Sequence, residues 1–309
     1  MRAETTSTLF DIVASLYLGR VVYGLAFLSA LGFAFASVWQ ARASRAESTD
    51  LNMSGMLLIR MFRSSSFLAS MAFDVIGVGG QFIALTLGAI GIVQPIIALG
   101  LIIALLIEHF VTKRRMSLGE FVVSVIATAA LAVFVGLRPL HVTDVVHEGW
   151  SLLVTILSLA FCGTLLLVAR FSIRLPSLLI SSVAAIALGC AAVLEREVGI
   201  QLHHGVLVVL SHWQIWGLLV VAPITLLLVQ SAFQLAEMKT VLPILTVGEP
   251  ILAVGLGRLM LSEPIFPGST WYVGLVLVVV LVVSLLYLAR SEVRFEDVIA
   301  QRSEGESND

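Results

Sequence analysis

The chain has 309 residues, of which 59% are hydrophobic and only 12% charged, and its formal net charge at pH 7 is −2. A soluble domain carries about 25% charged residues, and a water-soluble core of this length has no room for so much apolar surface. The composition therefore excludes an ordinary soluble protein and predicts one whose solvent is the lipid bilayer. The small net charge gives no reason to expect a nucleic-acid partner.

Nine apolar stretches follow one another along the chain, each about 20 residues long, which is the length that a helix needs to cross a membrane. They cover residues 21–40, 66–87, 90–111, 119–138, 150–169, 176–194, 213–233, 241–261 and 271–289. Trp150, Trp213 and Trp271 each open a stretch, as expected of aromatic side chains at a membrane surface. The sequence predicts an all-α integral membrane protein with about nine transmembrane helices.

The two ends of the chain differ from these stretches. Within the N-terminal segment 1–20, the apolar part 8–19 is too short to span a bilayer and contains Asp11, so we expect an interfacial helix there. Residues 291–309 are polar, and we expect them to form a disordered cytoplasmic tail.

Lysine and arginine are distributed unevenly between the loops. Thirteen of them fall on the side that holds the C-terminus and five on the other side. Because positively charged loops stay in the cytoplasm, the sequence predicts a multi-pass protein of the cytoplasmic (plasma) membrane. Its N-terminus would lie outside and its C-terminus in the cytoplasm.

A gapless internal match, at a constant offset of 148 residues, gives seven identities in twenty positions. Ala84, Leu87, Val93, Pro95, Ile96, Gly100 and Ile103 return as Ala232, Leu235, Val241, Pro243, Ile244, Gly248 and Ile251. The copies are five spans apart, so they should face opposite ways. We expect a first repeat of four spans in 21–138 and a second of five spans in 139–290. Inverted repeats of this kind are typical of alternating-access transporters.

Two carboxylates, Asp74 and Glu249, lie deep inside predicted spans. Each is about eight residues from the inner end of its span, which is about 12 Å at 1.5 Å per residue. Acidic side chains are costly inside a membrane and point to function by default. The pair would bind a cation or exchange a proton with the substrate. The alternative is that each bonds a neighbouring helix or neutralises Arg258.

Proline and glycine interrupt two of the spans near this depth. Gly248 and Pro250 flank Glu249, Gly91 and Pro95 lie near the start of the third span, and Pro243 repeats Pro95. A helix broken at mid-depth exposes carbonyl groups that can coordinate ions. The alternative is a plain kink in an otherwise continuous helix.

Four glutamines add polar groups to the same spans. Gln81 is seven residues after Asp74, Gln94 precedes Pro95, and Gln230 and Gln234 are one helical turn apart. Their amides would line a polar path together with the acids, or else act as hydrogen-bonding links between helices.

The sequence offers little for metal or cofactor chemistry. His203 and His204, on the predicted outer side, are weak candidates for a soft metal. No spacing matches a standard zinc site, no cofactor is implied, and no catalytic set is visible, so we do not expect an enzyme.

Taken together, these residues resemble the drug/metabolite transporter (DMT) superfamily, closest to its NIPA-like and EamA-like branch. The resemblance rests on Gln81–Leu85, Val93–Pro95, Lys113–Arg115 before Glu120, Gln230–Gln234, Leu242–Pro243, Gly248–Pro250 and Glu263. It implies the DMT fold and a transported solute, and some NIPA-like proteins are magnesium transporters. The chain departs from the family at Glu237–Lys239, where a Gly-Pro turn is usual, and at Glu249, where related chains often have aspartate.

The expected function is movement of a small solute across the cytoplasmic membrane by alternating access. The substrate would be a divalent cation such as Mg²⁺ or a small organic metabolite, and the protein would act in the bilayer alone or as a homodimer. The rival interpretation is a membrane scaffold without transport, or a protein that holds a lipid-linked intermediate of the cell envelope.

Overall fold

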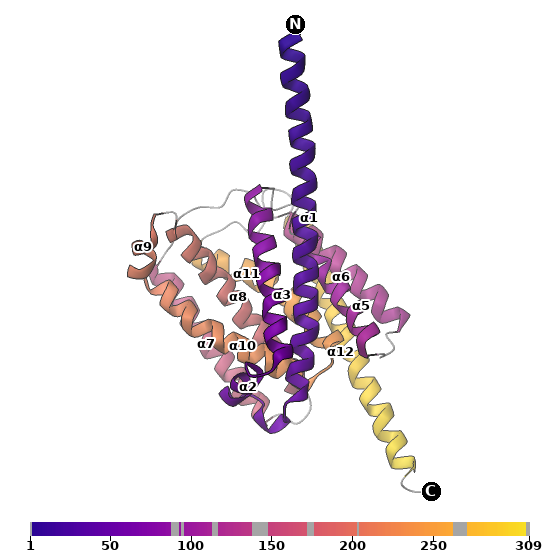
Figure 1. The fold of residues 1–309 in the computed structure, drawn as a ribbon. Coiled ribbons are helices and arrows are strands. Elements are labelled where there is room, and N and C mark those ends of the chain that lie inside the picture. The colour runs from indigo at the N-terminus through magenta and orange to yellow at the C-terminus, as the bar shows by residue number, and fades with distance from the viewer. Residues whose placement is uncertain are drawn as a thin grey trace.

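The computed structural model describes residues 2–87, 93, 96–112, 117–137, 148–171, 176–202, 204–261 and 271–306. Every regular element in these ranges is helical (Figure 1). The elements are α1 (Arg2–Ala46), η1 (Thr49–Leu51), α2 (Gly55–Met61), α3 (Ser65–Leu87), α5 (Gly100–Thr112), α6 (Leu118–Gly136), α7 (Glu148–Phe171), α8 (Pro176–Leu202), α9 (Val206–Ser211), α10 (Trp213–Leu235), α11 (Met238–Leu261) and α12 (Trp271–Glu306).

Six helices among the described residues are long and apolar enough to cross a membrane. They are α1, α7, α8, α10, α11 and α12. This confirms an all-α, multi-pass membrane protein. The other three predicted spans coincide with α3, which has 23 residues, and with the shorter apolar helices that include α5 and α6. Nine crossings therefore remain a prediction.

The first and last helices of the chain, α1 and α12, are longer than the sequence predicts. α1 runs without interruption for 45 residues from Arg2, so the stretch 8–19 continues the helix of the first span. α12 continues to Glu306, where a disordered tail is expected. Both ends project away from the bundle (Figure 1). No glycine or proline stands in 2–18 or in 290–304, and extending an existing helix is far easier than starting one.

α1 and α3 form a close pair built on small residues. A Cβ atom on Gly32 of α1 would lie 2.8 Å from the backbone nitrogen of Gly77 on α3. Ser29 Oγ donates a hydrogen bond of 2.7 Å to the Gly77 carbonyl, and a Cβ on Gly80 would meet the Leu25 carbonyl at 3.2 Å. Gly77 and Gly80 thus permit the close approach of the two helices, whereas nothing lies within 4 Å of a Cβ on Gly79.

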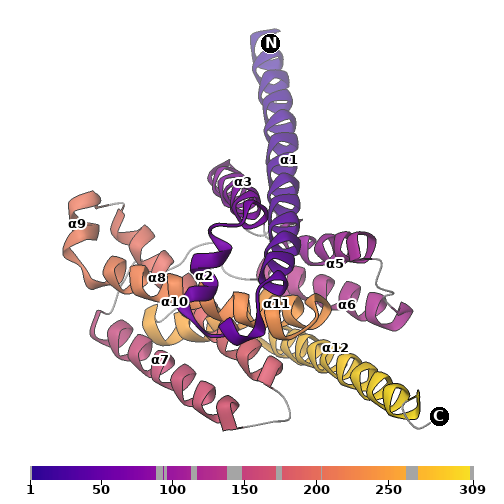
Figure 2. The same cartoon turned by 60° about the horizontal axis from the view of Figure 1, so that its bottom comes forward.

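α8 is the centre of the other side of the molecule. It packs against α7, α10 and α11, and Figures 1 and 2 both place α7, α8 and α10 on the side of the molecule away from α5 and α6. Gly189 lies against Leu252 of α11, and a Cβ on Gly248 of α11 would be 2.8 Å from the Cβ of Ala185. The largest cluster of buried apolar residues joins α8 to α1, α5, α10 and α11.

Candidate functional site

A chain of hydrogen bonds starts at Asp74 and crosses three helices. Gln40 of α1 donates from Nε2 to Asp74 Oδ2 on α3. Gln40 Oε1 in turn accepts a bond of 3.0 Å from Nε2 of Gln230 on α10. Ser44, one turn after Gln40, donates to the Gln230 carbonyl. We call Asp74, Gln40, Gln230 and Ser44 the polar relay.

The polar relay is buried at its centre. Gln40 is 8% exposed and Gln230 is fully buried, while Asp74 is half-buried. An uncharged amide therefore reaches the carboxylate from one side, and none of the described cations pairs with it. A carboxylate held in this way keeps its capacity to bind a proton or a cation.

Gln40 and Ser44 are the relay members that sequence reasoning missed. Gln40 closes the apolar stretch 21–40, where a polar residue is ordinary. The available signal was the spacing of Gln40 and Ser44, since residues four apart lie on one face of a helix. Asp74 and Gln230 were both predicted as site residues, and the structure connects them through Gln40.

Glu249 lies elsewhere, half-buried on α11. No hydrogen bond or ion pair among the described residues joins it to Asp74, and the charged group that acts on it is Glu195 of α8. The two predicted acids thus occupy different helix interfaces. Glu195 was not singled out from the sequence, because the predicted span 176–194 ends just before it.

The other predicted glutamines have separate positions. Gln81 is half-buried on α3. Gln234 holds the turn after α1, because its Nε2 donates to the carbonyls of Glu47 and Ser48 at 3.2 and 2.9 Å, and its Oε1 accepts from Asn52 at 3.0 Å. Gln234 therefore links α10 to the turn after α1. The predicted residues Gln94, Gly91 and Pro95 lie outside the described part of the chain.

α11 continues through both of its prolines, Pro243 and Pro250, from Met238 to Leu261. The interruption predicted at Gly248–Pro250 is thus not a gap in the helix. Proline removes one backbone donor and pushes on the preceding turn, which membrane helices tolerate when neighbouring groups compensate. Gly248 serves instead as the contact for Ala185 on α8.

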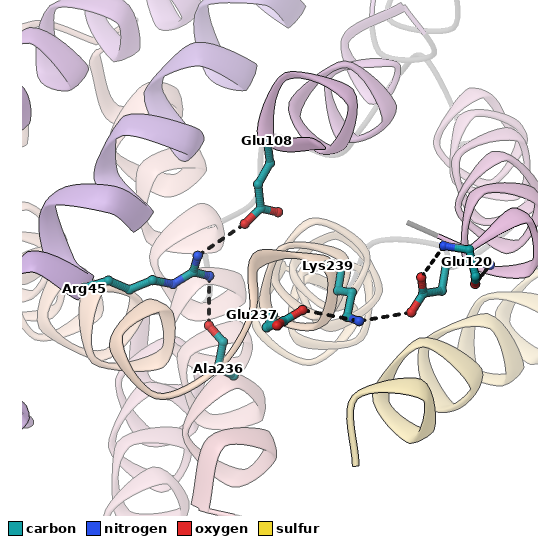
Figure 3. Close-up of polar contacts among 7 residues, drawn as sticks. Arg45, Glu108, Glu120, Ala236, Glu237 and Lys239 are labelled. Carbon is teal, nitrogen blue, oxygen red and sulfur yellow. Dashed lines mark hydrogen bonds and ion pairs between the residues drawn. The ribbon is translucent and has the colours of Figure 1, made fainter. Parts of the chain in front are cut away.

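A set of charged contacts lies where α1 ends and α11 begins (Figure 3). Arg45 of α1 pairs with Glu108 of α5, with 3.2 Å between Nη1 and Oε1. Its other nitrogens donate to the carbonyls of Phe233 and Ala236 at 2.9 Å each. These carbonyls close α10, where helix carbonyl groups lack partners within the helix and favour a cation.

Lys239, at the start of α11, extends these contacts to α6 (Figure 3). Its Nζ lies 3.1 Å from Glu120 Oε1 and 3.2 Å from Glu237 Oε2. Glu120 also starts α6, since its Oε2 accepts from the Ser117 amide at 2.8 Å while Ser117 Oγ accepts from the Glu120 amide at 3.2 Å. This reciprocal arrangement is a capping box.

We call Arg45, Glu108, Glu120, Glu237 and Lys239 the ion-pair clamp. It ties α1, α5 and α6 to the connection between α10 and α11. The segment Glu237–Lys239 supplies two of the five members. The role of these residues could not be read from the sequence, because their partners are far away along the chain.

The weak metal candidates gain no support from the described residues. His204 is exposed between α8 and α9, and His203 lies outside the described part. In the ranges that the structure describes, no three His, Cys, Asp or Glu side chains are grouped to hold a metal ion.

Comparison with known proteins gives a relative that matches almost from end to end. The chain is 26% identical over 275 residues to an uncharacterized protein of Corynebacterium glutamicum (strain ATCC 13032), and the match covers 88% of this chain and 94% of that protein. No family model matches the chain, and no solved structure matches it. The similarity therefore extends over most of the chain rather than one segment.

Proposed function

We propose that this protein is a multi-pass membrane transporter that moves a small solute across the cytoplasmic membrane by alternating access. The observation that carries the proposal is the polar relay, in which the Asp74 carboxylate is joined through Gln40 to Gln230. Asp74 belongs to the first predicted repeat and Gln230 to the second. A solute or proton that binds Asp74 would therefore act on both halves at once.

The packing of the helices supports two related halves. α1 packs against α3 and α5, and α8 packs against α10 and α11, which are the pairs expected if the offset of 148 residues relates the halves. The repeat-related glycines contact corresponding helices, because Gly100 lies against Ala30 of α1 and Gly248 against Ala185 of α8, although these two alanines are 155 rather than 148 residues apart. In Figure 1, α1 descends from the N-terminus, whereas α8 rises to α9, as inverted halves should.

The ion-pair clamp supports a gate at the cytoplasmic ends of the helices. The distribution of lysine and arginine puts these ends inside, and the clamp joins first-repeat helices to the α10–α11 connection. Ion pairs that are partly shielded from water can break and reform when two bundles rock. The structure then corresponds to a state that is closed towards the cytoplasm.

Two kinds of solute are candidates for the substrate. A divalent cation such as Mg²⁺ needs oxygen ligands and keeps several of its waters, and the relay offers one carboxylate and amide oxygens. A small organic metabolite with a positive group would use the same carboxylate. The resemblance to the DMT superfamily, in its NIPA-like and EamA-like branch, includes both kinds of substrate and is part of this proposal.

The test is uptake into vesicles that contain the purified protein. Mg²⁺, amino acids and nucleotide sugars form the panel, and each is measured with wild type, Asp74→Asn and Glu249→Gln. We expect Asp74→Asn to reduce uptake of the true substrate at least about tenfold, because a lost interaction of about 1.4 kcal/mol corresponds to that factor. Asp50→Asn, which removes an exposed carboxylate in η1, is the matched control and should transport normally.

Unchanged uptake in Asp74→Asn would remove the relay from the mechanism. A protein that binds a lipid-linked intermediate or organises other envelope proteins would show no uptake of any panel member, and both mid-membrane acids would be dispensable for its binding. That outcome would favour the scaffold interpretation.

A further inference from the structure

The short helix α2 lies alongside the spanning helices at the end that carries the ion-pair clamp. Leu57 and Met61 form its inner face, and both are fully buried with Phe67 of α3. Leu227 of α10 packs against the same cluster, and Figures 1 and 2 both place α2 beside α10. Leu227 is eight residues before Leu235, the last residue of α10, which is about 12 Å at 1.5 Å per residue. α2 therefore lies level with the end of a span and not beyond it.

The opposite face of α2 is apolar and exposed. Ile59 and Phe62 are 51% and 47% exposed, and residues three apart lie on one side of a helix. The Phe62 ring also meets the Phe67 ring edge to face, with 5.1 Å between their centroids, which fixes its position. Because the chain is a multi-pass membrane protein, an apolar stripe at the level of a span end is covered by lipid acyl chains.

Two arginines form a basic stripe next to the apolar one. Arg60 and Arg63 each follow a member of the apolar stripe and are exposed, and the Arg63 amide donates to the Arg60 carbonyl at 3.0 Å. Arg60 Nη1 reaches Glu47 Oε2 only at 3.8 Å, and no ion pair within the described ranges involves Arg63. No acidic residue occurs between Asp50 and Asp74. The basic stripe therefore carries positive charge that nearby side chains neutralise only in part.

An apolar and a basic stripe side by side are typical of a helix that lies in the plane of a membrane surface. The apolar side enters the boundary between headgroups and acyl chains, and the basic side reaches the phosphate groups. Guanidinium groups match phosphate oxygens in geometry as well as in charge, and each basic residue near the surface adds to the attraction for anionic lipid. A soluble anion would use the arginines alone, whereas an anionic phospholipid fits both stripes at once.

We propose that α2 lies in the membrane surface and binds an anionic phospholipid. Arg60 and Arg63 bind the headgroup phosphate, while Ile59 and Phe62 contact the acyl chains. The lipid holds the connection between α1 and α3 in one leaflet of the bilayer. The interaction requires no transport activity, so it stands or falls independently of the proposed function.

The experiment measures which lipids surround α2. The full-length chain carries Ile59→Cys labelled with a bimane fluorophore, after Cys162 and Cys190 are replaced by alanine, and is reconstituted into phosphatidylcholine vesicles. Brominated phosphatidylglycerol or brominated phosphatidylcholine is included at the same mole fraction, because bromine quenches a fluorophore only at close contact. We expect the anionic lipid to quench the label at least about threefold more strongly, since both arginines attract it.

Three variants of the labelled chain separate charge from fold. Arg60→Gln combined with Arg63→Gln should make the two lipids equal quenchers. Arg60→Lys combined with Arg63→Lys keeps the charge and should retain most of the preference for the anionic lipid. Arg20→Gln is the matched control, because it removes an exposed arginine from the part of α1 that is far from α2. It should leave the preference unchanged.

Equal quenching by the two lipids in the labelled parent chain would overturn the proposal, and so would an equal loss of preference in Arg20→Gln. Quenching by aqueous iodide and by neither lipid would place α2 in water, where it would be the surface for a soluble partner instead. Loss of the preference on addition of inorganic phosphate would show that the arginines bind a soluble anion rather than a lipid.

Discussion

At the scale of single residues, the polar relay shows how an acidic side chain is accommodated inside an apolar bundle. Asp74 accepts from Gln40, and the free end of the Gln40 amide accepts from Gln230. Each group satisfies the next, so the arrangement depends on every member. Removing one partner leaves the other buried without a hydrogen bond, which costs more than the bond itself contributed.

Gln40→Ala should therefore destabilise the protein by about 1–3 kcal/mol, because it leaves the amide of Gln230 and the carboxylate of Asp74 without their shared partner. The measurement is the Tm of the purified protein. Ser37→Ala on the same helix is the control, since Ser37 Oγ bonds to the carbonyl of Phe33 within its own helix, one turn earlier, and it should change Tm little. A double-mutant cycle with Asp74→Ala should give a coupling energy of about 0.5–3 kcal/mol, and additive effects would contradict the relay.

Sequence reasoning found two members of the polar relay and missed the two that α1 supplies. Asp74 stood out because a carboxylate in an apolar stretch is rare, and Gln230 because Gln234 follows it one helical turn later. Gln40 and Ser44 did not, because they lie where the apolar stretch 21–40 was judged to end. Glu197 was missed in the same way, since α8 continues beyond the predicted end at 194 to Leu202 and Glu197 is fully buried. Burial by neighbouring helices cannot be read from the hydropathy of one helix.

At the scale of helices, the apolar lengths predicted positions well. The predicted spans 119–138, 213–233 and 271–289 correspond closely to α6, α10 and the start of α12, because apolar length and interfacial tryptophan both mark the ends of a span. The continuations of α1 and α12 beyond their spans were not predicted: a separate interfacial helix was expected at 8–19 and a disordered tail at 291–309, since hydropathy carries no information about helices that continue beyond the apolar region. The prolines of α11 could not distinguish a kinked helix from a broken one, because the same Gly-Pro sequence pattern is compatible with both.

The close approach of α1 and α3 gives a prediction at this scale. Gly32→Ala would put a Cβ 2.8 Å from the backbone of Gly77, so the helices must separate, and we expect a loss of about 1–3 kcal/mol in stability. Gly24→Ala on the same helix is the matched control, because no atom lies within 4 Å of its new Cβ. It should be neutral or stabilising by up to about 1 kcal/mol, since alanine favours helix. Equal Tm values for the two variants would show that α1 and α3 do not pack as described.

At the scale of the whole molecule, two kinds of contact join the predicted halves. The polar relay joins them within the bundle, and the ion-pair clamp joins them at one end. The relay is buried and uncharged apart from Asp74, whereas the clamp consists of charged groups that keep some access to water; the side chains of Lys239 and Glu120 are 16% and 7% exposed. Charged contacts at such a boundary are more easily exchanged for water than a buried amide chain. If the halves move relative to each other, the clamp should open first.

The last prediction tests whether the clamp keeps this end closed. Glu108→Gln removes the partner of Arg45, and a loss of about 1 kcal/mol would raise the open population roughly fivefold. Thr240→Cys provides a thiol that reports opening, because Thr240 is 1% exposed and follows Lys239 on α11. The native Cys162 and Cys190 are first replaced by alanine, so that the introduced thiol is measured without them. The rate at which a water-soluble maleimide alkylates the introduced thiol should rise severalfold when Glu108→Gln or Lys239→Gln is added.

Glu47→Gln is the control for this measurement. It removes the partner of Arg60 in an exposed pair at 3.8 Å, so the same charge is lost near the same end of α1 without touching the clamp. An equal rise in alkylation for Glu47→Gln would mean that loss of charge alone loosens this end. If alkylation rises in the clamp variants alone, the clamp itself keeps this end closed. If the transported solute, once it is known, then reverses the rise, opening at this end is coupled to binding at the relay. The reason is that a ligand shifts an equilibrium only by preferring one of its states.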